Sequence, residues 1–167
     1  MNWLKRIRRA KEPIRAEDKG ALEDELRDWQ IVTVENREQQ SQATIRLRMR
    51  KPPLPDGAVF GCAVEISWPY EGDYPSPDVN QKQLAFETAL DDLSGMNGFS
   101  ELVQVSTGMG KKDWLFYTSD QDRFMRDFNS LLAGHDPYPI QINFYEDPSW
   151  QIWSEVVEAV QSKNGHR

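Results

Sequence analysis

Hydrophobic and polar residues alternate along several short segments of the chain, which is the pattern of half-buried β-strands. The longest alternation runs from Phe60 to Trp68 and follows a connector, residues 52–57, whose prolines cannot donate to a central ladder. The polar residues 36–42 separate the first two predicted strands, which indicates a hairpin. The predicted strands cover residues 31–35, 43–49, 60–68, 99–105, 114–118 and 140–145.

Three other segments place their hydrophobic residues on one helical stripe. Two of them, residues 79–93 and 120–132, each end at a glycine, and the third follows Asp147-Pro148 and runs to Val160. A capping residue with proline at the next position is typical of a helix start, and such a cap contributes about 1 kcal/mol. The predicted N-caps are Ser76, Ser119 and Asp147.

The order of these elements from residue 59 is β-α-β-β-α-β, which is the ferredoxin-like plan of an antiparallel sheet with helices on one face. A hairpin precedes this unit and a helix follows it, so the predicted class is α+β. All three helical stripes are expected to face the same side of the sheet. The predicted organisation is an extension over residues 1–28, partly helical, a single domain over 29–162 and a tail over 163–167.

Charge is spread unevenly along the chain. Residues 1–11 hold five basic residues and no acidic one, which leaves 15 basic against 27 acidic residues elsewhere, a net charge of −12. An acidic body argues against nucleic acid as the main partner and suits either solubility or a basic protein partner. The basic start, with Trp3, Leu4 and Ile7, is interpreted as a solubilising extension or as a segment that contacts a membrane surface or an acidic partner.

Composition also limits the chemistry. The single cysteine, Cys62, excludes an internal disulfide and a cysteine-based zinc cluster, and two histidines exclude a multi-histidine metal site. The chain shows neither a signal-peptide pattern nor an apolar run of about 20 residues, so we expect a cytoplasmic protein without a membrane span. No cofactor is expected.

The candidate catalytic motifs have structural explanations. The segment TGMGKKD lacks the spacing of a phosphate loop and leads into a strand, so a tight hairpin turn is predicted. His135 and Asp136 lie in a connector, and Cys62 falls on the inward side of a strand. Acidic residues Glu71, Asp73 and Asp78 are interpreted as part of a solvated loop. No catalytic residue is predicted, although a small-molecule hydrolase with an unrecognised site stays open as an alternative.

The outer face of the predicted sheet is the remaining candidate surface. Alternation places ten residues there: Arg46, Arg48, Glu65, Ser67, Gln104, Ser106, Leu115, Tyr117, Asn143 and Tyr145. Arginine and tyrosine are enriched at protein interfaces. The predicted partner-binding residues are Arg46, Arg48, Glu65, Tyr117, Asn143 and Tyr145. An RNA-binding module, a solvated face and a face covered by the N-terminal segment are the other interpretations, and the RNA-recognition signature is absent.

Three segments, together with the strands before them, resemble a known family. They are ISWPYEGDYPSPD, STGMGKKDWLFYTSD and RFMRDFNSLLAGHDPYPIQINFYEDPSW. They resemble the bacterial family called domain of unknown function 695, whose members pair a glycine-containing hairpin, an aromatic strand and a closing Asp-Pro-x-Trp. That family is similar in presumed fold to the ribonuclease E regulator B proteins, acidic inhibitors that act by binding. The resemblance implies a ferredoxin-like fold, supplies no catalytic residues to carry over, and leaves the function open. We expect a non-enzymatic protein-binding or regulatory module, of inhibitor or immunity type.

Overall fold

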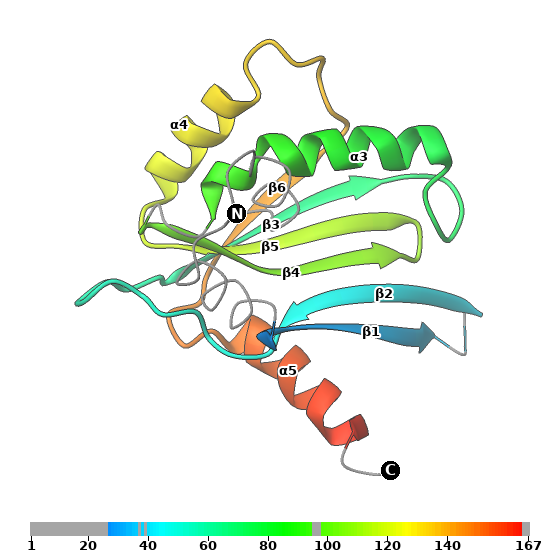
Figure 1. The fold of residues 1–167 in the computed structure, drawn as a ribbon, viewed down its shortest axis with the longest axis horizontal. Helices are drawn as coiled ribbons and strands as arrows, with labels where there is room; N and C mark the ends of the chain where they lie inside the picture. Colours follow the sequence, from blue (N-terminus) through cyan, green and yellow to red (C-terminus); the bar gives the residue numbers. More distant parts are fainter. Residues whose placement is uncertain (1–26, 37, 39, 95–97, 165–167) are drawn as a thin grey trace, which may run out of the picture.

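The computed structural model describes residues 27–36, 38, 40–94 and 98–164 (Figure 1). The predicted extension therefore lies outside the described residues except for its last two, and so do residues 165–167 of the predicted tail. The elements are β1 (Trp29–Asn36), β2 (Ser41–Arg48), β3 (Cys62–Pro69), α3 (Pro77–Ala89), the 3-10 helix η1 (Asp91–Leu93), β4 (Ser100–Gly108), β5 (Lys111–Thr118), α4 (Gln121–Leu131), β6 (Gln141–Glu146) and α5 (Gln151–Asn164).

The six strands form one sheet in the order β1-β2-β4-β5-β3-β6, and every neighbouring pair is antiparallel. The predicted α+β class is confirmed, and each predicted strand and helix overlaps an observed one. The N-terminal hairpin extends the sheet by pairing β2 with β4. This pairing brings the Gln42 carbonyl against Gly108, where a Cβ atom would overlap the carbonyl oxygen. Only glycine fits at this position.

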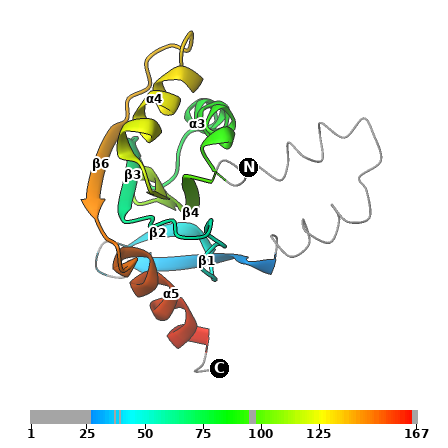
Figure 2. The same cartoon turned by 90° about the vertical axis from the view of Figure 1, so that its left-hand side faces the viewer.

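Helices α3 and α4 cover one face of the sheet (Figure 2). Phe86 and Leu90 from the α3 segment and Phe124 and Phe128 from α4 are buried in one core, which we call the α3/α4 core. The sheet contributes six buried residues to it: Val64, Ile66, Trp68, Val105, Trp114 and Phe116. The two helical stripes predicted from the sequence therefore meet in this core.

Helix α5 covers the opposite face, so the expectation that all three helices share one side is wrong. Its Trp153, Val157 and Val160 form a second core, the α5 core, with Phe60 and Trp150. The sheet contributes Leu47, Ala63, Val103, Leu115 and Tyr117 to this core. Strand β5 explains the error, because it is apolar and buried on both faces. Alternation in such a strand does not tell which face a helix covers.

A β-bulge between Leu102 and Gln104 in β4 changes the face of the residues around it. The sequence pattern assigns Val103 and Val105 to the same face, but Val103 lies in the α5 core and Val105 in the α3/α4 core. A bulge inserts one extra residue into a strand and so reverses the alternation. The expectation for strand β2 is wrong for another reason: its apolar side, with Ile45, Leu47 and Met49, packs in the α5 core and not, as predicted, against α3.

Candidate functional site

The three predicted N-caps have different outcomes. The Ser76 hydroxyl accepts the N–H of Val79 at the start of α3. Helix α4 begins at Gln121, so its N-cap is Asp120, whose carboxylate accepts the Arg123 N–H at 2.8 Å. The assignment of this cap to Ser119 is wrong because the helix starts one residue later than predicted.

Helix α5 begins at Gln151 and not directly after Asp147 as predicted, but the Asp147 side chain still caps its first turn. Its carboxylate accepts the N–H groups of Gln151 at 2.8 Å and Ile152 at 3.0 Å, the first two residues of α5. It also accepts the hydroxyl of Tyr117 in β5, at 2.6 Å. Burial would raise the pKa of Asp147, but these donors outweigh it and hold the pKa below its usual value. The bonds give this carboxylate a structural role in the fold.

Tyr117 is fully buried, so the expectation that it is exposed for partner binding is wrong. Its ring stacks on that of Trp150 with centroids 4.0 Å apart, and its hydroxyl oxygen also accepts the N–H of Trp153 at 3.3 Å. Burial and the neighbouring Asp147 raise the pKa of Tyr117. Trp150 adopts a φ of 60°, which is rare for a bulky residue, and its indole N–H donates to the Phe60 carbonyl.

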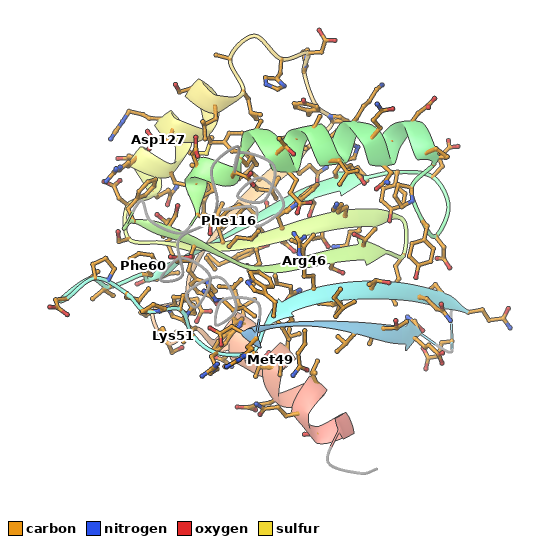
Figure 3. The ribbon with its side chains drawn as sticks, viewed as in Figure 1. Arg46, Met49, Lys51, Phe60, Phe116 and Asp127 are labelled. Atoms are coloured by element: carbon orange, nitrogen blue, oxygen red, sulfur yellow. The ribbon has the colours of Figure 1, made fainter. Side chains whose placement is uncertain are left out.

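The two arginines of β2 are engaged in ion pairs. Arg48 is buried and pairs with Glu101 at 3.3 Å, so its expected exposure is wrong. Arg46 lies on the side of the sheet that α3 covers (Figure 3) and pairs with Glu87 of α3. Arg46 keeps about a third of its side chain exposed (36%), but its charge is already engaged by Glu87.

Glu87 is the centre of an ionic cluster that the sequence reasoning missed. Lys112 of β5 pairs with it at 3.1 Å, in addition to Arg46. Burial would raise the pKa of Glu87, but the two cations outweigh it and hold the pKa below its usual value. The sequence did contain a signal for the burial of Glu87. Glu87 follows the buried Phe86 and lies four residues after the buried Gln83, which places it near the buried side of α3.

Glu65, Asn143 and Tyr145 remain accessible and lie together. Glu65 of β3 is paired directly with Asn143 of β6, and the Tyr145 hydroxyl donates to Glu65 at 3.2 Å. Tyr145 is 42% exposed. Cross-strand partners share a face, and Leu115 lies opposite Glu65 in the α5 core. These residues therefore continue the α5 face of the sheet into a part where side chains are accessible.

Other polar residues extend this accessible area across β5 and β6. The Ser67 hydroxyl donates to Asp113 at 2.6 Å, and Lys111 pairs with the same carboxylate at 2.8 Å. Asp113 raises the pKa of Lys111 by hydrogen bonding. The β3–β6 polar face, as we call it, consists of Glu65, Ser67, Lys111, Asp113, Gln141, Asn143 and Tyr145.

His135 and Cys62, the two residues with catalytic potential, contact different parts of the structure. His135 Nδ1 lies 2.8 Å from the Tyr138 hydroxyl in an exposed connector. Cys62 is half-buried, its thiol is near Gln121, and burial raises its pKa. Within the described ranges, neither contacts the other as a nucleophile–base pair would. Nor do those ranges contain a group of three or more His, Cys, Asp and Glu residues placed to hold a metal ion.

The glycine-rich segment forms the β4–β5 turn, as predicted. Gly108, Met109 and Gly110 all have positive φ angles. The turn also meets the loop after β3, because the Tyr70 N–H donates to the Gly110 carbonyl at 2.8 Å. Burial raises the pKa of Tyr70 to about 12. This segment therefore connects two strands and supports a neighbouring loop.

The region that holds these features coincides with a recognised family. The family model described as "Family of unknown function (DUF695)" matches residues 27–157. The chain belongs to the DUF695 family. The match contains all six strands, α3, α4 and the first half of α5 of this DUF695 protein. No curated protein and no solved structure matches the chain. Among the helices of the described residues, none is long and apolar enough to cross a membrane.

Proposed function

We propose that this DUF695 protein is a non-catalytic module that binds and regulates a basic protein, as an inhibitor or immunity protein does. The strand order β4-β5-β3-β6, with α3 and α4 on one face, supports a ferredoxin-like assignment for residues 62–146. A ferredoxin-like fold would be shared with binding proteins such as ribonuclease E regulator B, which is an analogy at the level of the fold. Function, however, has to be argued from a surface rather than from a fold.

The accessible β3–β6 polar face is the observation that carries the proposal. Helix α5 covers the remainder of this side of the sheet, with Tyr117 and Leu115 beneath it, but Asn143 and Tyr145 are exposed. A partly exposed tyrosine ring beside amide and carboxylate groups has the mixed character of a protein interface. Arg48 and Tyr117 are buried, and Arg46 is ion-paired, so the proposed surface retains Glu65, Asn143 and Tyr145 of the six residues predicted from the sequence.

Charge supports a basic partner. Residues 59–162 contain 17 acidic and five basic residues. Glu87, Glu101, Asp113 and Asp127 are among those that form ion pairs. An excess of exposed carboxylates attracts a cationic protein over distances of about a Debye length and increases its rate of association.

The proposal can be tested by capture from a lysate of the source cells. Wild type should retain a specific basic protein, and Asn143→Ala combined with Tyr145→Ala should reduce its capture by at least about tenfold without lowering the melting temperature. Such a loss corresponds to about 1.4 kcal/mol. Tyr74→Ala is the matched control, because Tyr74 is also an exposed tyrosine but lies in the loop after β3.

Two results would contradict the proposal. One is equal capture by wild type and by the double variant. The other is hydrolysis of a small ester or phosphoester, with the hydrolytic activity eluting together with the protein in gel filtration. The second result would favour the hydrolase alternative.

A further inference from the structure

Strand β6 forms one edge of the sheet and, within the described part of the chain, pairs with β3 alone. Figure 2 shows it at the margin of the molecule, with β3 on its inner side. Four of its six residues are exposed and the other two are half-buried. Its backbone groups on the outer side are therefore in a position to meet another chain.

The hydrogen-bond pattern shows which backbone groups point outward. The Asp147 N–H donates to the Gly61 carbonyl at 2.8 Å, one step beyond the pair of Cys62 with Glu146. In an antiparallel ladder, bonded and non-bonded pairs alternate. Every second residue of β6 therefore bonds β3, beginning from Asp147. The residues that turn their N–H and C=O groups toward the open edge are Ile142, Phe144 and Glu146.

We infer that β6 accepts an extended, basic segment of the partner protein as a seventh strand of the sheet. This inference rests on the proposed function and specifies how the partner binds. Main-chain bonds to the three outward residues would supply affinity, as in other cases of strand addition. Alternate side chains of the added strand would lie beside Asn143 and Tyr145, on the β3–β6 polar face.

Charge identifies the kind of segment that fits. Glu146 lies in this edge strand and Glu65 lies in β3 beside it, while Asp113, one strand further in, is paired with Lys111. Lysine or arginine at alternate positions of an added strand would lie on the same face as Glu65 and the Tyr145 ring, which favours cations over its face. The side chain of Glu146 lies on the other face of the same edge strand. A second copy of this chain fits less well, because each copy carries a net charge of −7.

The other edge of the sheet has a different charge. Strand β1 lies beside β2, which supplies Arg46 and Arg48, and both guanidinium groups lie over the Trp29 ring. Arg50 follows β2 and pairs with Asp28. The β1 edge therefore has paired arginines beside it, whereas the β6 edge has the carboxylates of Glu65 and Glu146. Pro139 and Pro148 flank β6 and limit the added strand to about six residues, since proline cannot continue a ladder.

The probe for this site is a capped octapeptide in which lysine and valine alternate, added to the full-length protein. Hydrogen exchange at Ile142, Phe144 and Glu146 should slow at least about tenfold at saturating peptide, because new hydrogen bonds protect these amides. The amides of Asn143 and Tyr145 already bond β3 and should change little. An octapeptide of alternating lysine and proline has the same charge but cannot form a ladder, and should give no protection.

Two variants at one position separate backbone pairing from charge. Glu146→Pro removes an outward N–H that β3 does not use, and Glu146→Gln removes the same charge but keeps the N–H. Glu146→Pro should raise the dissociation constant of the lysine–valine peptide at least about tenfold more than Glu146→Gln does. If Glu146→Pro does not fold, the exchange pattern of wild type decides the question.

Strand addition is overturned if the lysine–proline peptide binds as tightly as the lysine–valine peptide, or if protection appears at Ile31 and Thr33 of β1 instead. It is also overturned if both Glu146 variants weaken binding equally. Failure of the lysate capture, with peptide-dependent protection intact, would contradict the proposed function but not strand addition. The reverse outcome would contradict strand addition alone.

Discussion

The α3/α4 core joins the sheet to two helices through ring and hydrocarbon contacts, whereas the α5 core joins it to one helix through rings that also form hydrogen bonds. In the first, the Phe86 ring lies 5.0 to 6.2 Å from the rings of four other aromatic residues. In the second, the indole N–H groups of Trp150 and Trp153 each donate to a backbone carbonyl at 2.8 Å. The Tyr117 hydroxyl bonds Asp147.

The polar groups of the two cores are also arranged differently. Beneath α3, one carboxylate, Glu87, pairs with two cations, and the Trp114 indole N–H has no hydrogen-bond partner among the described residues. Beneath α5, the aromatic hydrogen bonds fix backbone at Phe60 and Arg48, two positions far from α5 in the sequence. The first core therefore depends on packing and one ionic cluster, and the second on directional bonds that set where a helix docks.

The largest expected effect comes from removing the charge of Glu87. Glu87→Gln leaves the buried Lys112 without its carboxylate, and breaking a buried pair in this way costs 3–5 kcal/mol in other proteins. We expect about 3 kcal/mol here, because Arg46 is partly exposed and water can solvate it. The measurement is the free energy of unfolding in urea.

A double variant provides the control for this prediction. Glu87→Gln combined with Lys112→Met removes both buried charges and should recover part of the lost stability. Simple additivity of the two single changes would show that the ionic cluster does not couple α3 to β5.

The second prediction concerns Asp147. Asp147→Ala should cost about 2–3 kcal/mol, the sum of a lost helix cap and an unpaired buried hydroxyl on Tyr117. This exceeds the value of about 1 kcal/mol expected for a cap alone. Asp147→Asn keeps an acceptor oxygen and should cost less. Equal losses in the two variants would contradict the hydrogen-bond explanation.

The same carboxylate should make stability depend on pH. The pKa of Asp147 is lowered in the folded state, so its contribution is fully present above its unfolded pKa of about 3.9 and is lost as the pH falls through the folded pKa. Glu87 acts in the same direction, because its pKa is also lowered. Unfolding curves between pH 7 and pH 2 should therefore show a smaller acid-side loss for Asp147→Asn than for wild type.

The smallest expected effect is a difference in stability loss between two substitutions, one at a tryptophan of each core. Trp114 and Trp150 are almost equally buried, at 1% and 2% exposure. Trp150→Phe loses the hydrogen bond to the Phe60 carbonyl, whereas Trp114→Phe loses no such bond. We expect Trp150→Phe to cost about 1 kcal/mol more, the net value of one hydrogen bond. A larger loss for Trp114→Phe would reverse the comparison of the two cores.

Much of the sheet could be predicted because its strands keep a period of two and its turns contain glycine or proline. The helix stripes of Phe86 and Phe124 likewise identified the α3/α4 core. The position of α5 could not be predicted in the same way. Strand β5 buries Phe116 on one face and Tyr117 on the other, so its pattern fits a helix on either side. The bulge at Leu102 then changed the face of Val103 in β4, and the apolar side of β2 packs in the α5 core instead of the α3/α4 core.

The candidate surface was only partly predictable for the same reason. Glu65, Asn143 and Tyr145 lie in β3 and β6, where the register is regular, and they share one face as expected. Arg46 and Arg48 lie in β2, whose apolar side packs in the α5 core, and Tyr117 lies in the doubly buried strand. Exposure of a strand residue depends on which helix covers it, and the sequence of the strand does not contain that information.

The hydrogen bond between the Trp153 indole and the Arg48 carbonyl joins residues 105 positions apart. Contacts of such separation close a long loop and form slowly. The strands and helices of the α3/α4 core all precede α5 in the sequence and therefore leave the ribosome before it. Until then, Leu47, Leu115 and Tyr117 lack the helix that buries them. We therefore expect the nascent chain to expose an apolar surface on one side of a formed sheet, where a chaperone would bind and where two unfinished chains would aggregate.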